Sequence, residues 1–142
     1  MSIKKVKDGY KISDSHSIIR FLKTHLYCDG MIVSPDFWKL KSNEDYLSCM
    51  WYEYRNKDIN KIKNDIKKIL KGQLDGYLPI QYIKDIQEIA QKHGLITVHA
   101  QFQGEKTKTS HSGLYNTSND YLFLSEMAME TSRIIKQQQI KM

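Results

Sequence analysis

The residues best suited to chemistry begin with His16 and Arg20, which stand four positions apart. At this spacing the two side chains point to the same side whether the segment forms a helix or a strand. Arg20 could hold a phosphate or carboxylate while His16 exchanges a proton near neutral pH. The alternative is structural, with the arginine paired to Glu53 or Asp14 and the histidine half exposed. We expect this pair, together with Trp51, to form an anion-binding patch.

Glu53 lies near the end of an aromatic-rich segment, 46–54, and follows Trp51 by two positions. In a strand these two side chains would share one face, which is otherwise apolar. A carboxylate held beside an indole can stay protonated and serve as an acid or base. Alternatively, Glu53 is the counter-ion that allows Arg20 to be buried.

His99 ends an apolar run, and His111 lies in the sequence Ser110-His111-Ser112 at the end of a polar stretch. If the fold brought the two histidines together, they could act as acid and base on a phosphodiester or nucleotide. The alternative is that His99 is a strand residue and His111 caps a turn. They could also join His16 as metal ligands, but the chain lacks an H-E-x-x-H motif and a C-x-x-C motif, so we predict no metal site.

A basic helical face is the fourth candidate. The chain carries a net charge of +6, and its basic residues are mostly lysines. In the segment 55–71 the residues Lys57, Lys61 and Lys68 line one outer strip of a predicted helix, where they could contact nucleic acid or an acidic protein. No aromatic residues are interleaved with these lysines, which argues against binding of single-stranded nucleic acid. The alternative is an ordinary solvated face.

Composition narrows the class of protein. The glycines form neither G-x-G-x-x-G nor G-x-x-x-x-G-K-S/T, so we expect no nucleotide cofactor. We expect a cytoplasmic protein, because no apolar run is long enough to span a membrane and no targeting signal is visible. Cys28 and Cys49 are expected to be reduced thiols.

These residues must be positioned by short strands and by helices with clear periodicity. We favour a strand over a helix for 16–22, although Ser13-Asp14-Ser15 could cap a helix there. The order predicts an α+β fold in which three helices pack on one face of a small, mainly antiparallel sheet. One domain, 1–142, is expected, with a flexible or edge segment at 1–9 and a frayed tail at 138–142. The remaining predicted elements are strands at 31–33, 37–40, 46–54 and 95–101, a polar loop at 103–112, and helices at 58–70, 80–93 and 121–137.

Several short motifs occur together over nearly the whole chain: Asp14-x-His16-x-x-x-Arg20, Tyr46-Leu47-Ser48-x-x-Trp51-x-Glu53-Tyr54, Val98-His99 and Ser110-His111. In these motifs the chain resembles a family of small bacterial proteins known only as hypothetical, uncharacterised proteins. It departs from that family where the approach to the second histidine contains a proline, since Glu105–Thr109 has none. The resemblance implies that the six candidate residues belong to one pattern, and it brings no known activity.

Two functional hypotheses follow. The first is a cytosolic binding module that docks a protein partner or an anionic ligand, in a bacterial defence, toxin-antitoxin or mobile-element setting. The second is a small enzyme acting on phosphodiester or nucleotide substrates, in which His99 and His111 are acid and base, Arg20 binds the phosphate and Glu53 orients a histidine. Proton transfer requires groups within about 3 Å or one water, so the positions of these side chains separate the two hypotheses.

Overall fold

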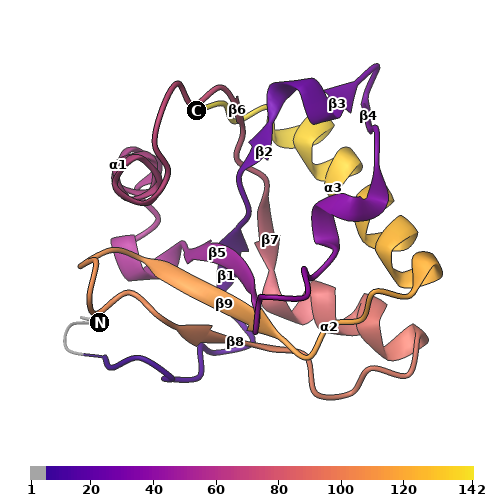
Figure 1. The fold of residues 1–142 in the computed structure, drawn as a ribbon, viewed down its shortest axis with the longest axis horizontal. Helices are drawn as coiled ribbons and strands as arrows, with labels where there is room; N and C mark the ends of the chain where they lie inside the picture. The colour runs from indigo at the N-terminus through magenta and orange to yellow at the C-terminus, as the bar shows by residue number, and fades with distance from the viewer. Residues whose placement is uncertain (1–5) are drawn as a thin grey trace.

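The computed structural model describes residues 6–142, which form a five-stranded antiparallel sheet and three α-helices (Figure 1). The strand order in the sheet is β7-β1-β5-β9-β8, so strands far apart in sequence lie side by side. The predicted α+β class is therefore confirmed. The elements of the sheet and the helices are β1 (Ser17–Ile19), β5 (Leu47–Trp51), β7 (Ile80–Tyr82), β8 (His99–Phe102), β9 (His111–Tyr115), α1 (Ile59–Ile69), α2 (Ile83–Lys92) and α3 (Tyr121–Gln138).

One face of the sheet packs against α2 and α3. Ile18 of β1 pairs with Trp51 of β5, and both side chains point into the main core. Ile83 and Ile86 of α2 and Phe123 of α3 meet them there, and all five side chains are almost completely buried. We call this the packed face.

The opposite face is covered only in part. Ile19 and Met50 alternate with the residues of the packed face and contact Ile62 and Ile66 of α1. The predicted placement of all three helices on one face is therefore wrong for α1, which Figure 1 shows apart from α2 and α3 with strands between them. Two adjacent buried isoleucines in β1 require cover on both faces of the sheet, because consecutive strand residues point in opposite directions.

The three helices follow the apolar periodicity of the sequence, with one error. The side chain of Asp58 accepts hydrogen bonds from the backbone N–H groups of Asn60 and Lys61 and so caps α1. The segment 80–93 is not one helix, because Ile80–Tyr82 extends as β7 alongside β1. The side chain of Gln138 bonds both the N–H and the C=O of Ile80, which satisfies the free edge of that strand.

The segment between β1 and β5 is built from short pieces that lie over α3. These are β2 (Leu22–Lys23), β3 (Tyr27–Cys28) and β4 (Met31–Ile32), and β2 pairs with β6 (Gly76–Tyr77). The predicted extended segment at 37–40 is wrong at its start, because Pro35–Trp38 forms a 3-10 helix capped by Ser34. Trp38 is buried there and donates a hydrogen bond to Thr131 of α3.

Both ends of the described chain are held by backbone hydrogen bonds. Near the start, the N–H groups of Gly9 and Ile12 bond to carbonyls of β8, so this segment covers the outer edge of β8. A flexible or edge segment is predicted at 1–9, and positions 1–5 of it lie outside the described residues. The tail is not frayed, because Ile140 accepts from Leu78 N and Met142 N donates to Gly76 beside β6. Both cysteines are free thiols.

Candidate functional site

His16 and Trp51 form a closed pair at the packed face. Trp51 Nε1 donates a hydrogen bond to His16 Nδ1 at 3.0 Å, and the Tyr10 ring stacks on the indole. Trp51 is 1% exposed and leaves no surface for a ligand. The Nδ1 atom of His16 is occupied as the acceptor of the Trp51 hydrogen bond.

Glu53 has a structural partner rather than a catalytic one. β5 ends at Trp51, and Glu53 begins a short 3-10 turn that bends back towards β1. Its carboxylate accepts from Ser17 N at 2.7 Å and from Ser17 Oγ at 3.1 Å. The prediction that Glu53 balances the charge of Arg20 is therefore wrong, since the carboxylate ties the turn to the start of β1.

Arg20 lies at the other end of β1 from His16. Four residues of strand separate their backbones by about 13 Å, so the two side chains do not share one ligand. The guanidinium donates to the carbonyl oxygens of Ser48 and Phe37, each at 2.6 Å. It also lies against the rings of Phe37 and Trp38. Among residues 6–142, Arg20 forms no ion pair with a carboxylate.

His99 and His111 share a face of the sheet but lie at opposite ends of the β8–β9 pair. His99 is paired with Tyr115, which is four residues from His111 along β9. This spacing corresponds to about 13 Å, far beyond the reach of a shared proton. The structure therefore does not form the acid and base pair that the enzymatic hypothesis requires.

The two histidines instead belong to a surface of aromatic and polar side chains. The β8–β9 half of this face is not covered by a helix within residues 6–142, and most of its side chains are half exposed. Ring centroids lie 5.5 Å apart for His99 and Tyr115, 5.2 Å for Tyr115 and Tyr46, and 5.9 Å for Tyr46 and His111. We call this surface the open face; it consists of Tyr46, Ser48, His99, Gln101, Gln103, His111 and Tyr115.

Hydrogen bonds between its own side chains hold the open face in place. Gln103 donates to the hydroxyl of Tyr115 at 2.6 Å, and the side chains of Gln101 and His99 meet at 2.7 Å. Gly113 lies beneath the Tyr46 ring, where a Cβ atom would overlap it. The rings are therefore positioned before any ligand arrives.

Ser48 and His111 come closest to a catalytic arrangement. Ser48 Oγ lies 2.8 Å from His111 Nε2, which is the geometry of a nucleophile and its base. Burial lowers the pKa of His111 below its ordinary value, so the imidazole is neutral at pH 7. The backbone of Gln103 also bonds the imidazole, but among the described residues no carboxylate is bonded to it, so the acidic member of a triad is missing.

Comparison with known proteins gives no relative. No family model, curated protein or solved structure matches the chain. The resemblance drawn from the motifs therefore stays a prediction.

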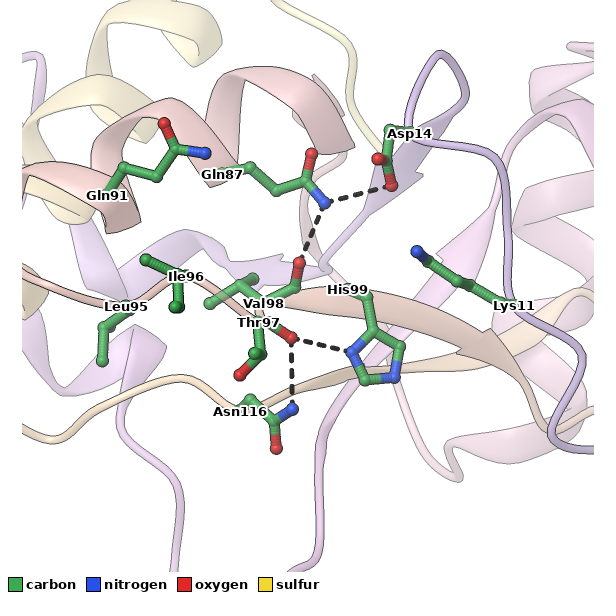
Figure 2. A pocket seen from close by; sticks show the side chains of 10 residues that line it. All are labelled: Lys11, Asp14, Gln87, Gln91, Leu95, Ile96, Thr97, Val98, His99 and Asn116. Atoms are coloured by element: carbon green, nitrogen blue, oxygen red, sulfur yellow. Dashed lines mark hydrogen bonds between the residues drawn. The ribbon is translucent and has the colours of Figure 1, made fainter.

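A cavity of about 460 Å³ is lined in part by His99, which also belongs to the open face (Figure 2). Gln87 of α2 bonds both Asp14 and the carbonyl of Val98, and closes one side. Figure 2 shows Lys11 reaching in between Asp14 and His99. His99 Nδ1 is 2.9 Å from the carbonyl of Thr97, so both ring nitrogens of His99 have partners. The cavity is polar and has no free histidine nitrogen.

The predicted lysine strip lies on the outside of the molecule. Lys57, Lys61 and Lys68 are all exposed, with the isoleucines of α1 turned to the sheet as expected. Among residues 6–142, no cluster of three histidine, cysteine or acidic side chains could hold a metal ion. Likewise, no helix in this part of the chain is both long and apolar enough to cross a bilayer.

Sequence reasoning missed two polar groups. One is an ion pair inside the fold, in which Arg55 bonds Asp65 with two hydrogen bonds of 2.8 Å. Ser110 donates to the same carboxylate, which fixes the loop before β9 to α1. The other is the open face, whose signal was the alternation His99-x-Gln101-x-Gln103 and His111-x-Gly113-x-Tyr115. The second half of this signal is hidden because the polar run 103–112 predicts a loop.

Proposed function

We propose that this protein is a non-catalytic binding module that docks a protein partner on the open face. The observation that carries the proposal is the row of four half-exposed rings, His99, Tyr115, Tyr46 and His111, on a sheet surface that no described helix covers. Aromatic rings of this kind supply large contact area at a low entropic cost. Such residues are enriched at the centres of protein interfaces.

The other side chains of the open face support the same proposal. Gln101, Gln103 and Ser48 offer hydrogen bonds that adapt to a partner, and the open face itself contains no lysine, arginine or carboxylate. Tyrosine and serine, which both occur here, are enriched in antibody binding surfaces. It differs from the lysine strip, which carries charge without aromatic anchors.

Charges near the Tyr46 end favour a protein over a nucleic acid. Burial raises the pKa of Tyr46 above its ordinary value, and the negative charges of Asp8, Asp45 and Glu44 raise it further. Nucleic acids carry a dense negative charge and bind mainly through cations. Carboxylates beside the rings therefore disfavour a phosphate backbone and favour a segment with basic or hydrogen-bonding groups.

The proposal is tested by co-purification from the native host with matched variants. Tyr46→Ala combined with Tyr115→Ala removes two rings of the open face, whereas Lys61→Glu combined with Lys68→Glu reverses two charges of the lysine strip. We expect a stoichiometric protein partner that remains with the lysine variant and is lost from the tyrosine variant. A partner retained by the tyrosine variant and lost from the lysine variant would place the binding surface on α1. Circular dichroism of both variants controls for folding.

A further inference from the structure

Arg20 differs from the other two arginines of the chain in its partners. Arg55 is paired with Asp65, and Arg133 with Glu130. Within residues 6–142, Arg20 bonds only the carbonyl oxygens of Ser48 and Phe37. Its Nε atom is buried and has no hydrogen-bond partner among the described residues. A largely buried cation without an anion is costly, so its environment requires an explanation.

In the part of the chain that the structure describes, no neighbouring group neutralises this charge. Cys49 lies next to Arg20, but burial raises the pKa of its thiol to about 12, so the sulfur is uncharged at pH 7. Burial lowers the pKa of Arg20 to about 10, which still leaves the guanidinium protonated at pH 7. Glu44 is near enough to favour the charged guanidinium, but its carboxylate accepts instead from the backbone N–H of Lys41. Arg20 therefore remains an unpaired cation.

A cavity of about 160 Å³ adjoins Arg20, between the end of β1, the middle of β5 and the last turn of α1. Arg20, Ser48 and Cys49 contribute to its lining, and the rest of the lining is apolar and includes Ile66 and Ile69. A cavity of about 150 Å³ with an apolar lining can hold a molecule the size of benzene. The space therefore suits about six non-hydrogen atoms.

We propose that this cavity binds a small organic carboxylate, with its carboxylate on the Arg20 guanidinium and a short aliphatic tail against Ile66 and Ile69. The unpaired cation selects a negative head group, because a charge-assisted hydrogen bond to a carboxylate supplies the anion that the fold lacks. The apolar lining selects a hydrocarbon tail over a fully hydrated ion such as phosphate. The site is separate from the proposed protein partner, although Ser48 contributes to both surfaces.

Butyrate is a suitable probe, since it has six non-hydrogen atoms. The Arg20 Nε–H resonance of the full-length protein, labelled with ¹⁵N, is followed by NMR while butyrate, butyramide or inorganic phosphate is added. We expect a saturable shift with butyrate and none with butyramide, which has the same shape without the charge. Equal responses to butyrate and butyramide would overturn the role of Arg20, and an equal response to phosphate would overturn the role of the tail.

Variants in α1 keep the test independent of Arg20, whose replacement could unfold the protein. Ile69→Phe fills the cavity, whereas Ile59→Phe is a matched control on the same helix at a position that does not line it. We expect the saturable response to butyrate to disappear in Ile69→Phe and to persist in Ile59→Phe. No response in the wild-type protein, or an unchanged response in Ile69→Phe, would overturn the proposal.

Discussion

On the packed face, His16 is bonded to a buried tryptophan, whereas on the opposite face His99 and His111 belong to a half-exposed row of rings. Both faces carry histidines beside large aromatic side chains, but these side chains have different roles. The packed face uses its histidine in an internal hydrogen bond to a buried indole. The open face also satisfies its polar groups internally, but it keeps ring surfaces and amides accessible to a partner. All three histidines have intermediate exposure, so the partners of each ring, rather than its residue type, separate a structural histidine from a candidate binding histidine.

The largest expected effect comes from breaking the packed face. Trp51→Ala removes a fully buried indole and leaves His16 without its donor, so we expect a loss of about 3–5 kcal/mol in the free energy of unfolding. Tyr115→Ala on the open face should cost about 1 kcal/mol or less. Urea denaturation followed by circular dichroism measures both. Similar costs for the two variants would contradict the distinction between the faces.

The next largest effect concerns the ion pair that fixes the loop before β9. Asp65→Asn leaves Arg55 without its carboxylate, and we expect a loss of about 2–3 kcal/mol because Asp65 is 2% exposed while water partly screens Arg55. The exposed pair of Arg133 and Glu130 is the matched control, and Glu130→Gln should cost less than about 0.5 kcal/mol.

The same pair predicts a dependence on pH. Burial alone would raise the pKa of Asp65, but hydrogen bonds from Arg55 and Ser110 outweigh it and lower the pKa below its ordinary value. The unfolded chain therefore binds the proton first as the pH falls. The stabilisation is fully present above about pH 4, the pKa in the unfolded chain, and it is lost as the pH falls through the lower pKa of the folded state. Wild type and Asp65→Asn should converge in stability under acid. A constant difference between them down to pH 2 would contradict this assignment.

Much of the fold follows from the sequence, and the exceptions have physical causes. The isoleucine periodicity of α1 and α2 fixed their buried sides, and only the first three residues of 80–93 were misassigned. The apolar pattern of Ile80–Tyr82 fits the start of a helix as well as a strand, and pairing with β1 selects the strand. Helices cover both faces of the sheet because of the way the strands are ordered in it. The local hydrophobic pattern of the sequence does not determine that order.

The candidate site was predicted less well. His99, His111 and Ser48 occur in the recognised motifs, and the structure places them on one surface together with Tyr46 and Tyr115. His16 and Arg20 appeared equivalent in sequence but lie at opposite ends of β1, and Glu53 bonds Ser17 rather than either of them. Residue types alone cannot show that Ser17 rather than Arg20 occupies the carboxylate of Glu53.

A smaller change can disturb the open face without removing any of its side chains. Gly113→Ala places a methyl group where the Tyr46 ring lies, so the ring must move. We expect a loss of about 1–2 kcal/mol in stability, as is usual for overpacking, together with loss of partner binding. Aromatic NMR resonances of Tyr46 and Tyr115 report the displacement. Unchanged resonances with full binding would show that the ring row is not required.

The smallest predicted effect is the titration of His111. Because burial lowers its pKa, the unfolded chain takes up the proton before the folded one, so stability declines as the pH falls below about 6.5 and levels off below the folded pKa. His111→Gln should remove this part of the pH dependence. Imidazole NMR of the wild-type protein measures the pKa directly, and a value above 6.5 would contradict the burial of this ring.

The central claim is that the open face contacts a protein partner, and site-specific photo-crosslinking tests it most directly. The crosslinking residue p-benzoylphenylalanine is introduced at Gln101 on the open face and, in a separate protein, at Lys68 on α1. We predict that the partner recovered by co-purification crosslinks from position 101 and not from position 68. A crosslink to that partner from position 68 alone would contradict the account.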